Sequence, residues 1–366
     1  YSANGALTTS SFSGQTGMSL LRGGSVGING NFNNNARVDV GGSLFMAGNN
    51  FTASADVSVA TDLHAANGLA FSGHAVSVGR DAFVGGSVQG GTLDVAGTLT
   101  VPQQASVNAG GTHQVARGPV SVAPPCECGA SAVLDVSALV ARFETHNDNA
   151  LVAFDANAGN NVSGETTIEL PCGRLYLANL TGTGHVRFTV PGRTALFVKG
   201  SVNLGQLTVD LGAEGELDLF VEGGVTAAGN VQLGSSTTPA RARMYLGGQT
   251  LNLQQAGTLA GNVYAPSATL TTGGSGLTVY GSLFVGNLNY DRDIVEAGEA
   301  CRTEQDGGVP GFDGGSDVGV DGGTCSACVD CPTHACVDGQ CGACRTSADC
   351  CVPFTCSDGR CILDIG

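Results

Sequence analysis

Apolar and polar residues alternate in short bursts along the first third of the chain, and the bursts recur at a nearly constant distance. Five segments share one pattern, an apolar–polar–apolar triplet, a small or polar turn and a second such triplet: LLRGGSVGI from Leu20, VDVGGSLFM from Val38, VSVATDLHA from Val57, VSVGRDAFV from Val76 and LDVAGTLTV from Leu93. Their starting positions are almost evenly spaced, and Arg22 and His64 interrupt the pattern mildly. Alternation with period two is typical of β-strands, and a fixed spacing indicates a repeat architecture.

The pattern predicts a parallel β-helix (β-solenoid), which we expect to be right-handed. Strands of about three residues are not stable alone, so coils of equal length must stack and pair equivalent strands in parallel. Two neighbouring ladders should result, with Val38, Val57 and Val76 facing inward and Asp39, Ser58 and Ser77 facing outward. Glycine, aspartate and serine between the strands suit tight corners.

The second half of the chain repeats the theme with longer coils. Its segments include LFVKGSV, LFVEGGV, MYLGGQT, VYAPSAT and LFVGNLN, whose third positions are Val198, Val221, Leu246, Ala265 and Val285. The steps between these positions vary more than those of the first half, and the first two steps are longer. The alternative is an antiparallel sandwich or barrel, which predicts turns at intervals of about 8–12 residues and no long period. The recurring spacing favours the solenoid and an all-β fold.

These repeats resemble those of bactofilins and of filamentous-haemagglutinin-type adhesins, and the whole arrangement resembles secreted β-solenoid proteins of myxobacteria. The resemblance covers most of residues 19–297. It implies a right-handed β-helix. Bactofilins are cytoplasmic and lack a cysteine-rich tail, so their cytoskeletal role is not expected to transfer.

Breaks in the pattern divide the chain into parts. Residues 119–170 interrupt the repeat, and apolar residues at helical spacing follow Asp135, a suitable N-cap: Val136, Leu139, Val140 and Phe143. We expect this short helix to cover a sheet edge or to lie along a face of the solenoid. The predicted parts are an N-terminal arm (1–18), solenoid (19–118), insertion (119–170), solenoid (171–300), a Gly/Asp-rich linker (301–324) and a cysteine-rich module (325–366).

Fourteen cysteines indicate an oxidising compartment and a disulfide framework. Ten lie in the C-terminal module, where a run of three equally spaced cysteines occurs twice: Cys325, Cys328, Cys331, Cys336, Cys341, Cys344, Cys350, Cys351, Cys356 and Cys361. Zinc binding by the Cys-x-x-Cys pairs with His334 is the competing interpretation. The TSADCCVPFTCSDGRC stretch resembles Dickkopf-type and knottin-like modules, in which such a module is a rigid recognition unit. Of the other four, we expect Cys172 to pair with Cys126 or Cys128, and the remaining one with Cys301 or another chain.

Charge and hydropathy narrow the range of partners. Only 13% of residues are charged, the net charge is −16, and Lys199 is the single lysine. No basic face can form for nucleic acid or anionic lipid, and no apolar stretch is long enough to span a bilayer. The chain starts at Tyr1 rather than Met, so we expect an export signal to have been removed and the protein to be secreted or exposed on the outer cell surface. We expect no cofactor, except that the acidic surface could bind Ca²⁺ weakly.

No catalytic or cofactor motif appears in the sequence. The acids placed on strands, Asp39, Asp94 and Asp218, form no evident pair, and the tyrosines Tyr176, Tyr245, Tyr264 and Tyr280 are expected in structural ladders. The remaining candidate is a local basic site of Arg187, Arg193, Arg241 and Arg243. The preferred function is therefore a structural role at the cell surface or in the extracellular matrix, without enzymatic activity. The alternative is a polysaccharide-active enzyme, or an adhesin that binds carbohydrate or protein.

The N-terminal arm is the predicted assembly element. Its stretch Ala6, Leu7, Thr8 and Thr9 could add a strand to a neighbouring copy, because a solenoid end exposes unpaired backbone groups. Self-association end to end into filaments follows from this hypothesis. Deletion of residues 1–18 would then leave the fold intact.

Overall fold

The structure is a computed structural model that divides into two units, residues 1–302 and 303–366, each considered separately. In the first unit it describes residues 6–14, 18–20, 24–35, 37–48, 51–126, 133–255, 257–273, 277–290 and 294–296. In the second unit it describes residues 336–337, 340–341, 345–346, 354–357 and 360–363.

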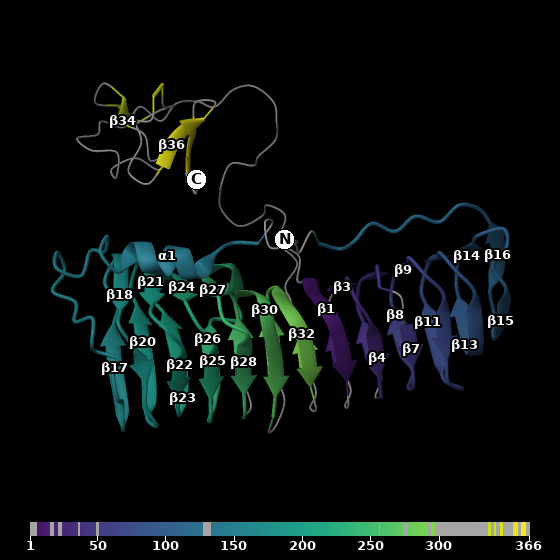
Figure 1. Cartoon of the computed structure of the whole chain (residues 1–366), viewed down its shortest axis with the longest axis horizontal. Helices are drawn as coiled ribbons and strands as arrows, with labels where there is room; N and C mark the ends of the chain where they lie inside the picture. The colour runs from purple at the N-terminus through teal and green to yellow at the C-terminus, as the bar shows by residue number, and fades with distance from the viewer. Residues whose placement is uncertain are drawn as a thin grey trace. The chain divides into compact units, whose positions relative to one another are not determined.

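The first unit is a parallel β-solenoid of about 12 turns, as predicted (Figure 1). Its N-terminal half contains β1 (Ala6–Gly14), β2 (Met18–Leu20), β3 (Ser25–Ile28), β4 (Phe32–Asn34), β5 (Val38–Val40), β6 (Leu44–Met46), β7 (Phe51–Ala53), β8 (Val57–Val59), β9 (Leu63–Ala65), β10 (Leu69–Phe71), β11 (Ala75–Val78), β12 (Ala82–Val84), β13 (Val88–Val95), β14 (Thr98–Val101), β15 (Val107–Gly110) and β16 (Gln114–Arg117). The C-terminal half contains β17 (Glu165–Glu169), β18 (Gly173–Leu177), β19 (Leu180–Thr181), β20 (His185–Val190), β21 (Arg193–Val198), β22 (Val202–Leu204), β23 (Gln206–Leu211), β24 (Glu216–Val221), β25 (Val225–Ala227), β26 (Val231–Gly234), β27 (Ala242–Leu246), β28 (Thr250–Leu253), β29 (Gly257–Ala260), β30 (Asn262–Thr272), β31 (Leu277–Tyr280), β32 (Leu283–Tyr290) and β33 (Ile294–Glu296). The helix α1 (Val136–Phe143) lies between the halves in sequence, and a short 3-10 turn, η1 (Pro239–Arg241), precedes β27.

Each coil contributes strands to three faces, and each face is one continuous parallel ladder. Face 1 runs through β18, β21, β24, β27, β30, β32, β1, β3, β6, β9, β12, β14 and β16. Face 2 runs through β19, β22, β25, β28, then the later residues of β30, β32 and β1, and on through β4, β7, β10, β13 and β15. Face 3 runs through β17, β20, β23, β26, β29, β31, β33, β2, β5, β8, β11 and the end of β13.

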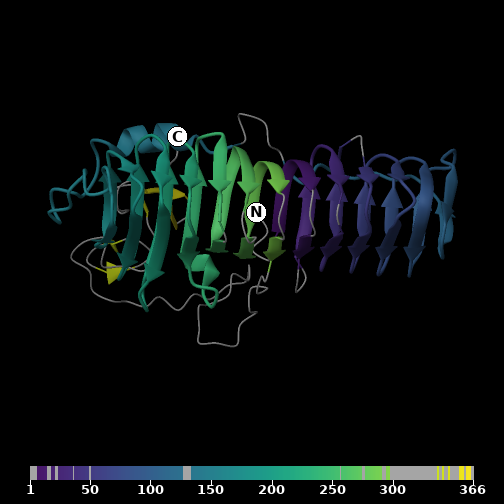
Figure 2. The same cartoon turned by 90° about the horizontal axis from the view of Figure 1, so that it is seen from below.

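The spatial order of the coils differs from their order in the sequence. Strand β1 pairs with β32 on one side and with β3 and β4 on the other, and β2 likewise joins β33 to β5. The C-terminal half therefore precedes the N-terminal half along the solenoid axis, and the two meet in its middle (Figures 1 and 2). The prediction of a free N-terminal arm is wrong. Ala6, Leu7, Thr8 and Thr9 do lie in a strand, but both edges of that strand are paired within the chain.

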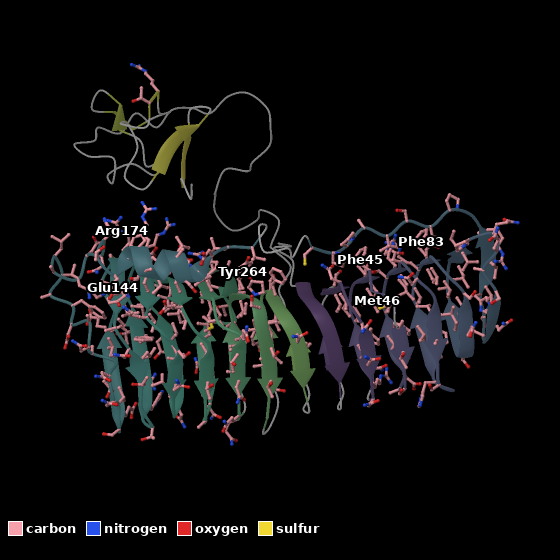
Figure 3. The ribbon with its side chains drawn as sticks, viewed as in Figure 1. Phe45, Met46, Phe83, Glu144, Arg174 and Tyr264 are labelled. Carbon is pink, nitrogen blue, oxygen red and sulfur yellow. The ribbon has the colours of Figure 1, made fainter. Side chains whose placement is uncertain are left out.

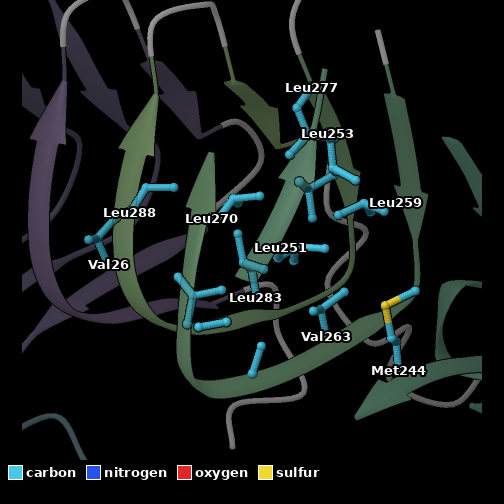
Figure 4. Close-up of a cluster of buried hydrophobic side chains, with 14 of the residues drawn as sticks. Val26, Met244, Leu251, Leu253, Leu259, Val263, Leu270, Leu277, Leu283 and Leu288 are labelled. Atoms are coloured by element: carbon cyan, nitrogen blue, oxygen red, sulfur yellow. The ribbon is translucent and has the colours of Figure 1, made fainter. Parts of the chain in front are cut away.

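A single apolar core fills both halves. Buried residues from Val26 to Leu288 form one cluster, and these two side chains enter the same interior from opposite sides of the junction (Figure 4). The predicted inward ladder is confirmed, because Val38 pairs with Val57 and Val57 with Val76, all at most 1% exposed. A core shared in this way joins the halves by hydrophobic burial as well as by backbone hydrogen bonds.

Corner side chains complete the stacking, as the sequence predicted. Oδ1 of Asp62 accepts a hydrogen bond from the backbone of Asp81 (3.2 Å), whose own Oδ1 accepts from the backbone of Thr98 (2.8 Å). Each carboxylate thus satisfies a backbone donor of the next coil, at a place where the ladder is interrupted. At Gly90, where φ is +77°, a Cβ atom would lie 2.3 Å from the carbonyl oxygen of Phe71, so glycine is required there.

The described residues between the halves, 118–126 and 133–143, run back along face 1 (Figure 1), and we call them the return segment. Gly118 approaches Thr100 at its start, Asn29 Nδ2 donates to the carbonyl oxygen of Cys126 (2.7 Å), and Leu134 N–H donates to the Tyr264 hydroxyl (2.8 Å). Helix α1 follows, with Asp135 as its N-cap accepting from Ala138 N–H (2.9 Å), as predicted. The helix lies along face 1 over β18, β21 and β24 and buries Val136, Val140 and Phe143. In the described part of the chain, no helix is long and apolar enough to cross a membrane.

The second unit contains two small antiparallel hairpins. They are β34 (Cys336–Val337) with β35 (Gln340–Cys341), and β36 (Phe354–Ser357) with β37 (Arg360–Leu363). Cys336 lies opposite Cys341, and Cys356 lies opposite Cys361, so the two copies of the sequence duplication form equivalent hairpins. The linker 301–324 and the following cysteines lie outside the described residues: Cys128, Cys301, Cys325, Cys328, Cys331, Cys344, Cys350 and Cys351. The choice between disulfides and zinc in this module stays a prediction.

Candidate functional site

Face 2 carries a column of uncharged, mostly hydrogen-bonding residues along its whole length. We call it the hydroxyl–amide column. The strand registers align, in spatial order, Thr181, Asn203, Thr226, Asn252, Thr271, Asn289, Ser13, Asn33, Thr52, Ala70, Gln89 and Asn108. Ala70 is the one member whose side chain cannot hydrogen-bond. No position in the column is charged, in a chain whose net charge is −16.

Where the structure describes their burial, the side chains of this column face solvent because their strand neighbours fill the core. Asn203 lies between buried Val202 and Leu204, and Asn252 between buried Leu251 and Leu253. Parallel strands are about 4.8 Å apart, so the column presents one side chain at each such step. Among the described side chains, those of Asn203, Thr226, Asn252, Thr271, Asn33, Thr52, Gln89 and Asn108 make no hydrogen bond to the rest of the protein. Their donors and acceptors are free for water or a ligand.

Face 3 is different, because its outward side chains include charges that pair with one another. Arg187 contacts Asp210 (2.5 Å) and Glu165 (3.8 Å), and the neighbouring His185 is 2.9 Å from the Thr208 hydroxyl. In the N-terminal half, the predicted outward ladder of Asp39, Ser58 and Ser77 is confirmed and continues to Asp94.

The acids that the sequence singled out do not gather. Asp39 binds Arg37 (2.9 Å). Asp94 is separated from Asp39 on face 3 by Ser58 and Ser77, and it accepts a hydrogen bond from the backbone N–H of Thr112 (2.8 Å). Asp218 lies on face 1, where it binds Arg243 (3.0 Å). The structure therefore brings no two of these carboxylates together in the way that a paired acid–base mechanism requires.

The arginines that the sequence grouped are separated or neutralised. Arg243 lies between Asp218 and Glu216, whose hydrogen bonds and charges raise the pKa of its guanidinium. Arg241 donates to the carbonyl oxygen of Ala213, and Arg193 begins β21 opposite Glu216. Arg187 belongs to face 3. No free basic site results among these four residues.

Face 1 is occupied by the protein's own return segment. Its outward column in the C-terminal half is aromatic, with Tyr176, Phe197, Phe220, Tyr245, Tyr264 and Phe284 in register. The ring of Phe143 from α1 stacks on Phe197 at 4.0 Å between centroids, and Phe197 stacks on Phe220 at 4.8 Å. The expectation of tyrosines in a structural ladder is confirmed for Tyr176, Tyr245 and Tyr264, and Tyr280 lies instead on face 3.

The aromatic column resumes on the other side of the junction. His64 lies between Phe45 and Phe83, with ring centroids 4.6 and 5.0 Å away. Phe45 and Phe83 are labelled in Figure 3. Burial lowers the pKa of His64, and the nearby Asp62 opposes that shift. The histidine that interrupted the sequence pattern is thus a half-buried member of an aromatic stack.

The helix is fastened by an ion pair at its C-terminal end. Lys199 Nζ lies 2.7 and 2.8 Å from the carboxylate oxygens of Glu144, and this hydrogen bond lowers the pKa of Glu144. Burial raises the pKa of the Tyr176 hydroxyl beneath them. The single lysine of the chain therefore serves to hold α1 on face 1.

The cysteines near the return segment are only partly as predicted. Cys126 is disulfide-bonded, whereas Cys172 is a free, exposed thiol. The expected pairing of Cys172 with Cys126 or Cys128 is wrong. Cys172 directly precedes β18, on the coil beside the helix, whereas Cys126 is hydrogen-bonded to Asn29 in the N-terminal half. The two cysteines therefore lie in different halves of the solenoid, which the order of the sequence does not reveal. Within the described residues, no group of three or more His, Cys, Asp or Glu could hold a metal ion.

Sequence reasoning missed the hydroxyl–amide column, although a signal for it was present. Apart from Leu69–Phe71, the third triplet of the coils has a hydroxyl or amide residue at its centre, as in VNL, VTA and LNL from Val202, Val225 and Leu251. The repeats quoted for the first half covered only the other two triplets. The three-strand coil was needed to place this position on one face.

The fold defines the chain as a parallel β-solenoid protein. Residues 127–298 match the family model DUF7305, described as a domain of unknown function, so the chain is a β-solenoid protein with a DUF7305 domain. The match takes in α1 and the C-terminal half and none of β1–β16. Comparison with curated proteins and with solved structures finds no match.

Proposed function

We propose that the protein is a structural component of the outer cell surface, without enzymatic activity, which lies along a neutral surface polysaccharide through the hydroxyl–amide column. The observation that carries the proposal is the column itself. It extends over every level of the ladder of face 2 and contains no charge.

A regular array of weak donors and acceptors suits a repeating ligand. A single hydrogen bond exchanged with water contributes only about 0.5–1.5 kcal/mol, which would not retain a small molecule on a flat face. A polymer that engages several positions at once gains by multivalency, since each further contact is intramolecular. The rigid solenoid supports this mode because the positions are held in register by the core.

The chemistry of the column favours a neutral polymer over a charged one. Hydroxyl and amide groups both donate and accept hydrogen bonds, as sugar hydroxyls do. An acidic polymer would be repelled by a chain with a net charge of −16. The disulfide at Cys126 supports an oxidising location outside the cytoplasm.

Co-sedimentation with insoluble polysaccharides tests the proposal. The full chain would be mixed with cellulose or chitin, and with an insoluble acidic polysaccharide for comparison. We expect retention on a neutral polymer and none on the acidic one. Failure to bind any neutral polysaccharide would refute the proposed ligand class.

A matched pair of variants locates the binding surface. Asn252→Asp with Thr271→Asp places two charges on face 2, and Gln232→Asp with Thr258→Asp places two charges on face 3 of neighbouring coils. None of the four side chains is buried, so both proteins should fold. The face 2 variant should lose most binding and the face 3 variant should keep it. Equal losses would mean that the column is not the contact surface.

A further inference from the structure

The two ends of the solenoid are built differently. At one end, residues 148–164 form an irregular coil over β18 and β19. Asn149 accepts from the backbone N–H of Tyr176 (2.9 Å) and donates to its carbonyl oxygen (2.8 Å), and Ala178 N–H donates to Ala156 (2.8 Å). This coil satisfies the backbone groups that faces 1 and 2 would otherwise expose, which protects these edges from pairing with another chain.

The opposite end has no such cover within the described residues. Strand β16 pairs with β14 alone, and β15 pairs with β13 alone. Val115 continues the core column beyond the fully buried Leu99, yet it is 43% exposed. The chain then turns back over face 1 at Gly118, beside Thr100, and leaves the end open.

Charge distinguishes the open end from the rest of the molecule. Residues 98–118 contain no aspartate or glutamate, and Arg117 is their single Arg or Lys. At the capped end, β17 carries the exposed Glu165 and Glu169. Two copies of a chain with a net charge of −16 repel each other over most of their surface, so the open end is where a second copy can approach without facing carboxylates.

We propose that two copies join open end to open end, with β16 of one copy pairing with β16 of the other. A twofold axis makes this pairing antiparallel and self-complementary, because each copy presents the same edge. Val115 of each copy is then covered, and the unpaired backbone groups of β16 find partners. The other ends are capped on faces 1 and 2, and on face 3 their edge strand β17 carries the exposed carboxylates of Glu165 and Glu169, which repel a second copy. The assembly therefore closes as a dimer and does not grow into the filament that the sequence suggested.

Sedimentation velocity of the full chain over a range of concentrations tests this inference. We expect a species of twice the 36.5 kDa chain mass. Val115→Lys should weaken the dimer by about tenfold or more, because two like charges would meet at the axis. Since Val115 is already partly exposed, the variant should keep the circular dichroism spectrum of the parent protein.

The matched control is Thr167→Lys, an exposed position on β17 at the capped end. This variant should dimerise like the parent protein. A monomer at all concentrations, a series of larger oligomers, or a dimer unaffected by Val115→Lys would each overturn the proposal. Binding to polysaccharide through face 2 does not depend on this contact, so the two proposals can fail separately.

Discussion

Replacing Val57 by aspartate would place a carboxyl group inside the solenoid between two stacked valines. Val57 is 1% exposed and pairs with Val38 and Val76. Loss of the buried valine side chain costs about 1.5–3 kcal/mol. A fully buried acid has its pKa raised by up to about 3–5 units. Each pH unit above the unfolded-state pKa of about 3.9 adds about 1.36 kcal/mol until the folded-state pKa is reached, so the charge penalty at pH 7 is about 4 kcal/mol. The sum is comparable with the whole stability of a typical domain.

The same substitution one residue further along provides the control. Ser58 points outward beside Asp39, so Ser58→Asp adds like-charge repulsion across the ladder, which costs at most about 1 kcal/mol. Urea unfolding followed by far-ultraviolet circular dichroism compares the two variants. Similar midpoints for both, or a larger loss in Ser58→Asp, would refute the assignment of inward and outward positions.

The pH dependence separates the charge effect from the loss of packing. In Val57→Asp the folded-state pKa is raised above the unfolded value of about 3.9. The charge penalty is therefore absent below that pH and grows by about 1.36 kcal/mol for each unit of pH above it, until the folded-state pKa is reached. Relative to the parent protein, the variant should regain stability as the solution is acidified. A loss that stays constant with pH would mean that the introduced carboxyl group reaches water.

Three other predictions follow from the structure. Deletion of residues 1–20 removes β1 and β2, which join the two halves of the solenoid, so the midpoint of thermal unfolding should fall. An unchanged midpoint would contradict the pairing of β1 with β32. Burial lowers the pKa of His64, so the unfolded chain binds more protons than the folded chain, and the free energy of unfolding should fall as the pH drops through about 6.5. Urea titrations at several pH values should show a weaker pH dependence of this free energy in His64→Phe. The same pH dependence in the variant and the parent protein would refute the role of His64. Asn149→Ala leaves both backbone groups of Tyr176 without their partner, which should cost about 1–3 kcal/mol; hydrogen exchange should show faster exchange of the Tyr176 amide, whereas full protection would show that the cap does not depend on Asn149.

The alternation of residues was sufficient to predict the coil and the direction of its side chains. Valines at Val38, Val57 and Val76 recur at the coil length with a polar residue after each, and a period of two allows one assignment of inside and outside. The helix could also be predicted from neighbouring residues, because Asp135 specifies its start and the apolar residues after it specify its buried face. Such features depend on neighbours in sequence or on a constant repeat, so the amino-acid sequence determined them.

The order of the coils was decided only in the tertiary structure. Parallel pairing uses backbone groups that every coil presents alike, so nothing in the pattern around Leu7 indicates that β32 will be its neighbour. The placement of the return segment on face 1 follows from that order, as do the free thiol of Cys172 and the capped and open ends. The hydroxyl–amide column is likewise continuous only because β1 joins the two halves in register. The repeat therefore determined what one coil looks like, and the long-range pairing determined which surfaces the assembled solenoid presents.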